Sequence, residues 1–442
     1  MKESRSRRSV LCGLAAASSA VTAGCFGENT PRQPTTTTTP PTRRGNSVLR
    51  AELGLSLPPY DIEDQLRVFQ WREYWPRETI RHFEQAFGVD VTVDYYESNE
   101  EMYRSLHDPS APSYDLVFPS GYFVTVLVGE GRIVPFDLEK LSNWSNLERR
   151  WQLDQTYDPG PGRHSVPFQW GTTGIGWNRE LATLPSPVSW DVLWDQDHAG
   201  RVTMLNDVRE TIGVALKRLG HSLNTTSESE IREAGALLRE QRPLLRGYDS
   251  TNMVSNLVDR RASPIHTWSG EAFIAYWQLF QNGESPIEYR IPDEGGVMWV
   301  DSAAIPADAA HPNAAHAFVD YLLNPKVNAS ISNYVFYATP NEAAWPYVDD
   351  WILENPDIYP SPDCLEKLEF VRDVGPAIET YQDVWEELTG TSIESPAATL
   401  PTREVHKVGV ERRSVDGQPT FWPSHGGPPA AALAGLQRQR PS

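Results

Sequence analysis

The sequence predicts an α/β protein with two lobes or domains, and three observations support this. Strand and helix patterns alternate between residues 66 and 118. A second alternating region follows around residues 202–241. With 442 residues, the chain is long enough to bury a large core and to divide it between two lobes. Such alternation builds sheets that are covered by helices on both faces.

The alternation is clearest in the first part of the folded body. Residues 66–70 form a short apolar run that predicts a strand, and Pro76 begins a helix with one apolar face. Residues 89–93 alternate with period two, as a half-buried strand does. A capping box at 98–101 opens the next helix, and a third strand follows at 115–118. This order implies a largely parallel sheet.

The second part repeats the pattern. The predicted strands lie at 202–205, 264–268 and 297–301, and the predicted helices lie at 228–241, 314–322 and 375–388. The glycine-rich run 171–177 lacks the Lys-Ser/Thr of a phosphate loop and the spacing of a dinucleotide site. It predicts a strand that packs closely against a neighbour.

Both ends of the chain differ from this body. Residues 1–25 resemble an export signal, with Arg7-Arg8 before a short apolar run and a lipobox-like cleavage site at Cys25, the expected lipidation site. A secreted protein without lipid is the alternative. Residues 26–64 are rich in Thr and Pro and predict an extended linker. Residues 401–442 lose periodicity and predict a disordered tail.

Composition excludes several classes of partner and site. The formal net charge of −20 repels nucleic acid and anionic membrane surfaces. An acidic, Lys-poor surface is typical of proteins from organisms that live at high salt concentration. Outside the leader the chain has one cysteine, Cys364, and no metal-binding spacing, so we expect no metal and no cofactor.

The run Asp207–Glu210 places two carboxylates at the start of a predicted helix. The helix dipole favours anions there, so both are expected to be ionised at neutral pH. A solvated helix cap is the ordinary interpretation of such a pair. A hydrolase could also use the pair for acid–base work. The sequence contains no HExxH, GxSxG or P-loop motif, however, and we expect no enzyme.

Aromatic and acidic residues also gather where predicted strands end. Trp71, Trp268 and Trp299 each stand beside polar residues at such an end, although tryptophan near a strand is ordinarily core. A ring at a cleft can attract a desolvated cation by about 0.5–2 kcal/mol, and carboxylates supply directed partners for ammonium groups. Together these residues predict a site for a small organic cation.

Seven segments in order then resemble a known family: Trp71–Tyr74, Tyr96–Glu100, Tyr114–Ser120, Trp170–Gly176, Asp207–Glu210, Met298–Ser302 and Thr339–Asn341. From about residue 66 to 388 the chain resembles the spermidine/putrescine-binding proteins of ATP-binding cassette (ABC) importers. The resemblance implies a two-lobed periplasmic-binding-protein-like (type II) fold with a ligand cleft between the lobes. Lobe 1 is expected to hold residues 65–168 and 298–345, and lobe 2 residues 169–297 and 346–400.

The resemblance also implies a role and a site. A monomer, lipid-anchored outside the cell, would capture a polyamine and deliver it to an ABC permease. The implied ligand-binding residues are Trp71, Glu73, Tyr74, Ser120, Tyr122, Asp207, Glu210, Trp268, Trp299, Asp301 and Tyr337. Another small organic cation or an amino-acid-like solute remains the alternative ligand, and a secreted hydrolase or a structural surface protein the alternative class. Arg72 and Val371 depart from the family pattern, which offers a small polar residue and an amide there.

Overall fold

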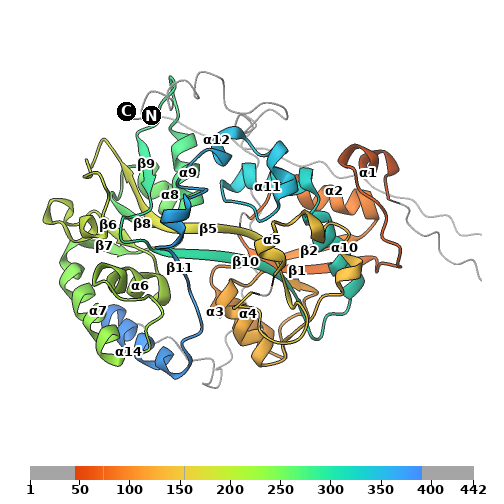
Figure 1. Cartoon of the computed structure of the whole chain (residues 1–442), viewed down its shortest axis with the longest axis horizontal. Helices are drawn as coiled ribbons and strands as arrows, with labels where there is room; N and C mark the ends of the chain where they lie inside the picture. Colours follow the sequence, from red (N-terminus) through yellow and green to blue (C-terminus); the bar gives the residue numbers. More distant parts are fainter. Residues whose placement is uncertain (1–44, 73, 154, 391–442) are drawn as a thin grey trace, which may run out of the picture. The chain divides into compact units, whose positions relative to one another are not determined.

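Eleven strands join into one mixed sheet in the part of the chain that the structure describes, which is residues 45–72, 74–153 and 155–390 (Figure 1). The protein is represented by a computed structural model. The strands are β1 (Gln65–Trp71), β2 (Asp90–Tyr96), β3 (Leu116–Val117), β4 (Ile133–Val134), β5 (Ser165–Asn178), β6 (Val202–Met204), β7 (Leu245–Tyr248), β8 (Ile265–Trp268), β9 (Ile287–Arg290), β10 (Val297–Pro306) and β11 (Glu369–Phe370). Their order is β2-β1-β3-β10-β5-β8-β6-β7, with β4 and β11 paired to β10 and β9 paired to β5.

Helices of mostly three turns or fewer connect these strands. They are α1 (Ser47–Leu53), α2 (Arg77–Phe87), α3 (Asn99–His107), α4 (Gly121–Gly129), α5 (Arg149–Gln152), α6 (Val208–Arg218), α7 (Glu228–Gln241), α8 (Met253–Val258), α9 (Ser269–Gln278), α10 (Pro312–Leu322), α11 (Pro325–Val335), α12 (Asp350–Leu353), α13 (Pro362–Leu365) and α14 (Ile378–Thr389). The helices predicted at 228–241, 314–322 and 375–388 correspond to α7, α10 and α14. All three predictions are confirmed.

The predicted parallel pairing is confirmed in the first part of the chain. β1 pairs in parallel with β2 and with β3, and helices α2 and α3 connect them. The capping box that opens α3 is half formed. Ser98 Oγ accepts from the backbone N–H of Glu101 at 3.1 Å, whereas the Glu101 carboxylate accepts from Glu97 N–H at 2.8 Å. Because β1 and β3 pair in parallel, their carboxyl ends lie at the same edge of the sheet.

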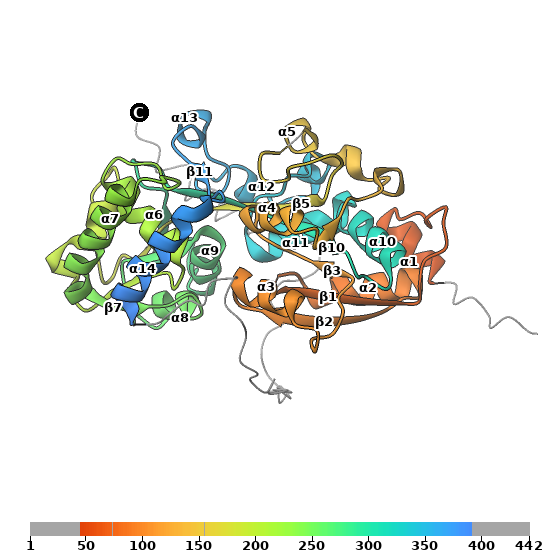
Figure 2. The ribbon, with the colours of Figure 1, turned by 90° about the horizontal axis from the view of Figure 1, so that it is seen from below.

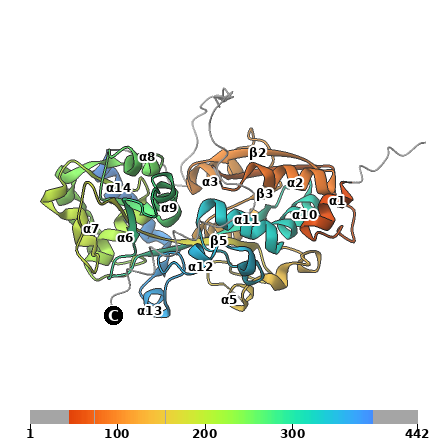
Figure 3. The same ribbon diagram turned by 90° about the horizontal axis from the view of Figure 1, so that it is seen from above.

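Two long strands, β5 and β10, run antiparallel through the middle of the sheet (Figure 1), and Figures 2 and 3 show the same ribbon from below and from above. On one side β10 pairs with β3 and β4, and along most of its length it pairs with β5. β5 then pairs with β8 and β9, beyond which lie β6 and β7. The glycine-rich run 171–177 lies in β5, whose fourteen residues are all buried, so its prediction as a closely packed strand is confirmed.

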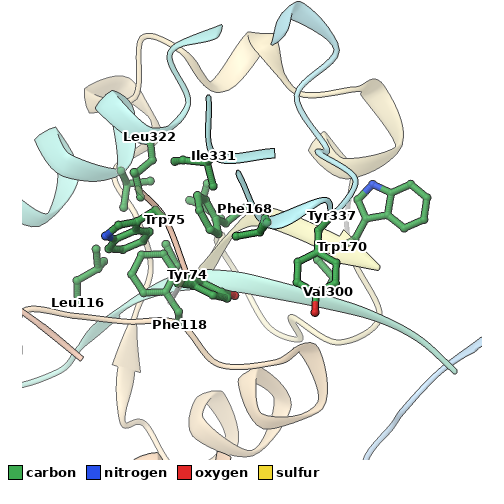
Figure 4. Packing of buried hydrophobic residues seen from close by; sticks show 14 of the residues in the cluster. Tyr74, Trp75, Leu116, Phe118, Phe168, Trp170, Val300, Leu322, Ile331 and Tyr337 are labelled. Carbon is green, nitrogen blue, oxygen red and sulfur yellow. The ribbon is translucent and has the colours of Figure 1, made fainter. Parts of the chain in front are cut away.

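Aromatic side chains dominate the core beside β1, β3 and β5 (Figure 4). The Tyr74 ring lies 5.9 Å from Phe118 and 5.4 Å from Phe168, and Trp75 lies 5.3 Å from Phe118, all measured between ring centroids. Edge-on and tilted contacts of this kind add to the burial of apolar area. They fix the chain that follows β1 against β3 and β5.

The prediction that residues 26–64 form an extended linker is wrong for the second part of this segment. Residues Ser47–Leu53 form helix α1, which is capped at its start by Asn46 and ends at Gly54 in the left-handed conformation. Leu49 and Leu53 pack against the main core, and Asn46 N–H donates to the Gln85 carbonyl of α2 at 2.6 Å. Packing of these partly buried leucines and the hydrogen bond to α2 stabilise a helix too short to form alone.

Several predictions concern residues outside the described part. The export signal, Cys25, the first part of the linker and the tail from 401 lie there, as does Glu73. The division into two lobes stays a prediction. No described helix is long and apolar enough to cross a membrane.

Candidate functional site

A cleft of about 1820 Å³ opens over the edge where β1 and β3 end and where α6 and α9 begin. Ten of the eleven predicted ligand-binding residues line it: Trp71, Tyr74, Ser120, Tyr122, Asp207, Glu210, Trp268, Trp299, Asp301 and Tyr337. The eleventh, Glu73, is not among the described residues. Segments that are more than 200 residues apart in sequence thus meet in one place.

Asp301 is the most tightly held acid of the cleft. It lies in β10 next to a register shift between Asp301 and Ser302, and its side chain accepts from two hydroxyls. Tyr74 Oη donates to Oδ2 at 2.6 Å, and Ser120 Oγ donates to Oδ1 at 2.7 Å. Burial raises the pKa of Asp301 to about 6, although both hydrogen bonds lower it. At neutral pH the carboxylate is ionised and fixed in orientation.

Asp207 and Glu210 form a second acidic group at the start of α6. Asp207 is the N-cap of this helix, and its Oδ1 accepts from Glu210 N–H at 2.9 Å. Glu210 Oε1 accepts from Thr173 Oγ1 at 2.9 Å and from Trp268 Nε1–H at 3.2 Å. A residue of β5 and one at the end of β8 therefore hold the glutamate on the cleft wall.

The expectation that both acids of this group are ionised at neutral pH is wrong for Glu210. Burial, followed by the charge of Asp207, raises the pKa of Glu210 to about 8. Burial also raises the pKa of Asp207, against two backbone hydrogen bonds that lower it. The favourable helix dipole is the weaker effect here because desolvation penalises a buried carboxylate more strongly. With this pKa, Glu210 is mainly protonated at pH 7.

Aromatic rings line the cleft together with these acids, among them Trp71, Trp268, Trp299 and Tyr337. Trp299 lies edge-on to Tyr337 with ring centroids 4.7 Å apart, and it covers Gly171 so closely that a Cβ there would lie 2.5 Å from the indole. The indole N–H of Trp71 donates to the Phe118 carbonyl at 3.0 Å. Trp268 is oriented by its hydrogen bond to Glu210. The rings are thus held before any ligand arrives.

Tyr337 connects the two acidic groups. Its hydroxyl is buried, and its pKa is raised by that burial and then by the charges of Glu271, Asp301 and Glu210. The pKa of this one phenol therefore depends on carboxylates that come from α9, β10 and α6. Asp301 and Glu210 line the same cleft.

Two polar residues near the site were not predicted. Asn99 Nδ2 donates to Ser120 Oγ at 3.1 Å, and its Oδ1 accepts from Ser120 N–H at 3.1 Å, so it positions the serine that holds Asp301. Burial, followed by the charge of Asp207, raises the pKa of Glu100 to about 7. Both lie in the run Tyr96–Glu100, which resembles the family and could have indicated them.

The two departures from the family pattern have different surroundings. Arg72 Nη2 forms an exposed ion pair with Glu97 Oε1 at 3.1 Å. Val371 is buried, lines the cleft, and packs with Leu223 and Val297 beside Trp299. Val371 therefore presents an apolar surface where an amide was expected.

The chemistry of the cleft is that of binding. Among the described residues no group of three or more His, Cys, Asp or Glu side chains could hold a metal ion. The cleft offers carboxylates, oriented rings and hydroxyls, which together recognise a cation with apolar segments. An α/β sheet with a cleft of this kind at its strand ends fits a solute-binding protein.

Comparison with known proteins identifies the family. The chain belongs to the bacterial extracellular solute-binding proteins, whose family profile matches residues 78–359. Over 336 residues it is 33% identical to the spermidine/putrescine-binding periplasmic protein of Escherichia coli (strain K12), covering 76% of this chain and 94% of that one. It is 30% identical to the putrescine/cadaverine-binding protein of Pseudomonas aeruginosa over 318 residues, covering 70% and 89%.

Solved structures confirm the predicted fold class. A spermidine/putrescine ABC transporter substrate-binding protein from Streptococcus pneumoniae has a TM-score of 0.64 at 27% identity, covering 74% of this chain and 98% of that chain. A lipoprotein of Treponema pallidum has a TM-score of 0.65 at 29% identity, covering 74% and 99%. The chain has the type II fold of periplasmic binding proteins. The family and these relatives are binding proteins.

Proposed function

We propose that this protein captures a polyamine of the spermidine/putrescine class outside the cell and delivers it to an ABC permease. The observation that carries the proposal is that two acidic groups, Asp301 and Asp207–Glu210, line one cleft together with Tyr337 and other aromatic rings. A polyamine has the matching pattern, since its ammonium groups are separated by short methylene chains. The names of the relatives, which refer to spermidine, putrescine and cadaverine, support the same ligand class.

Each part of the ligand has a partner on the cleft wall. One ammonium group donates to Asp301, whose two oxygens are already fixed by Tyr74 and Ser120. A second ammonium group donates to Asp207 and Glu210. The methylenes between them lie against Trp299 and neighbouring rings, where each buried CH₂ contributes about 0.8 kcal/mol. Cation–π attraction to the same rings contributes about 0.5–2 kcal/mol more.

Delivery requires a change that the permease can recognise. Lobes 65–168 plus 298–345 and 169–297 plus 346–400 close on the ligand, with β5 and β10 as the connecting strands. Closure removes water from the ammonium–carboxylate contacts and strengthens them. The protein acts as a monomer and is held at the outer face of the membrane by lipid on Cys25.

The ligand test is a thermal-unfolding panel on the purified full-length chain. Spermidine, spermine, putrescine and cadaverine are added alongside glycine betaine and arginine, each at the same excess over protein. A ligand that binds only the folded state raises the unfolding temperature. The proposal predicts a rise with polyamines and none with glycine betaine. A rise with arginine or glycine betaine alone would favour the alternative ligands.

The same samples separate a receptor from a hydrolase. After long incubation the added amine is recovered and its mass measured. A receptor returns it unchanged and in stoichiometric amount. Time-dependent conversion of the amine would contradict the proposed role.

A further inference from the structure

A buried histidine lies directly behind Glu210. His266 is on β8, fully buried, and its Nε2 lies 4.0 Å from Glu210 Oε2. Neither atom has a hydrogen-bond partner among the described residues, while Glu210 Oε1 has two. A buried donor or acceptor without a partner is costly, so two of them facing each other require an explanation.

The hydrogen bond on the other ring nitrogen indicates where the proton of His266 resides. The backbone N–H of Leu205, just after β6, donates to His266 Nδ1 at 3.4 Å. Nδ1 is therefore an acceptor, and the proton of the neutral ring is on Nε2. The Nε2–H group then points at the unpartnered oxygen of Glu210. Once Glu210 is ionised, the pair is one donor and one acceptor.

His266 cannot serve as a counter-ion in this position. Its burial lowers its pKa to about 3, so the ring is neutral at physiological pH. Trp190, at the start of η3 (Trp190–Trp194), faces the ring edge-on with centroids 5.5 Å apart. On β5, Ile175 lies opposite His266 in the register. Glu210 is the acidic group at ion-pair distance among the described residues.

The groups around Glu210 explain why a donor is needed there. Asp207 disfavours its ionisation by repulsion, whereas Thr173 and Trp268 favour it by donating to Oε1. The charge of Glu210 also contributes to raising the pKa values of two buried tyrosines. These are Tyr289 on β9 and Tyr337, two residues after the end of α11. The terminal torsion of Glu210 has broad minima, so a hydrogen bond requires only that the carboxylate turn to bring Oε2 nearer to Nε2, which lies 4.0 Å away.

We infer that His266 is a positioning residue that donates its Nε2–H to Glu210 Oε2 when a ligand ammonium group ionises Glu210. This inference rests on the proposed function of the cleft as an amine receptor. The neutral imidazole stabilises the carboxylate from behind while the ammonium binds in front. His266 thereby sets the pH range over which the cleft holds a cation.

The test compares pH profiles of spermidine affinity by calorimetric titration from pH 5.5 to 9. His266→Met removes the donor and keeps an unbranched side chain of similar volume. His266→Gln keeps an N–H donor. His198→Gln is the matched control, because His198 is a buried histidine outside the cleft.

We expect His266→Met to bind about tenfold more weakly than wild type at pH 7 and to need a pH about one unit higher for half-maximal affinity. His266→Gln should restore most of the wild-type profile, and His198→Gln should leave it unchanged. A wild-type profile in His266→Met would overturn the inference. So would equal shifts in His266→Met and His266→Gln, since packing alone would then explain them.

A second measurement needs no variant. In the proton NMR spectrum of the wild-type chain, spermidine should move the Nε2–H signal of His266 downfield as the new hydrogen bond forms. An unmoved signal in a chain that binds spermidine contradicts the inference and leaves the receptor function intact. If the wild-type chain binds no amine at all, the proposed function itself fails.

Discussion

Tyr74 donates a 2.6 Å hydrogen bond from its hydroxyl to Oδ2 of Asp301, a residue 227 positions later in the chain. Ser120 donates to the other carboxylate oxygen at 2.7 Å. Both oxygens are thus held by protein hydroxyls, and the carboxylate lines the cleft. A carboxylate held in this way loses little conformational freedom when a cation arrives.

Removing the Tyr74 hydroxyl should weaken amine binding without emptying the core. Tyr74→Phe keeps the ring against Phe118 and Phe168 but leaves Asp301 with one hydroxyl donor. The pKa of Asp301 should then rise above about 6, and affinity for spermidine at pH 7 should fall about tenfold. Calorimetric titration measures this. Tyr248→Phe is the control. Tyr248 lies outside the cleft, and its buried hydroxyl has no hydrogen-bond partner among the described residues, so this variant should bind like wild type.

Neutralising either acidic group should have a larger effect. Asp301→Asn and Asp207→Asn each leave a bound ammonium group without its ionic partner in a desolvated site. We expect affinity to fall about 100-fold in each variant. Equilibrium dialysis with labelled spermidine suits such weak binding. Asp350→Asn, an exposed acid on α12, is the control, and retained affinity in both cleft variants would rule out the acids as ammonium partners.

Affinity should rise with pH across the neutral range. Burial raises the pKa values of Asp301 to about 6 and of Glu210 to about 8 in the empty cleft, so protons occupy these acids at low pH. A cation binds the ionised form, while the ligand amine keeps its proton up to about pH 10. Binding at pH 7 therefore releases protons, and the apparent enthalpy should differ between phosphate and Tris buffers. Equal enthalpies in both buffers would show that no proton leaves.

The tryptophan of β10 depends on a glycine of β5. A Cβ on residue 171 would lie 2.5 Å from the indole of Trp299. Gly171→Ala should displace this ring from the cleft and lower spermidine affinity about tenfold. Tryptophan fluorescence during a spermidine titration reports both the ring and the affinity. Gly247→Ala on β7, where a Cβ meets nothing within 4 Å, should leave both unchanged.

The sequence predicts elements whose cause is local. The strand that ends at Trp71 and the helix that starts after Pro76 follow from apolar periodicity and helix-start residues within ten positions. Asp207 was placed at a helix start by the same kind of evidence, and it is the N-cap of α6. The acids and tryptophans at predicted strand ends indicated a cation site, whereas the full set of cleft-lining residues was implied by the family resemblance.

What the sequence could not predict depends on contacts between distant segments. The raised pKa of Glu210 results from burial in the folded chain and then from the charge of Asp207, against the hydrogen bonds that Thr173 and Trp268 donate from two other strands. Helix α1 was missed because its stability comes from packing on α2 rather than from its own seven residues. In both cases tertiary burial overrides the local pattern.

The most direct test of the central claim is a calorimetric titration of the full-length chain with spermidine at pH 8, where both acidic groups can ionise. Putrescine and glycine betaine are titrated in parallel, at low and at high salt. The account predicts binding of one polyamine per chain at micromolar or tighter affinity, and no binding of glycine betaine. The absence of binding heat with spermidine and putrescine at both salt concentrations would contradict it.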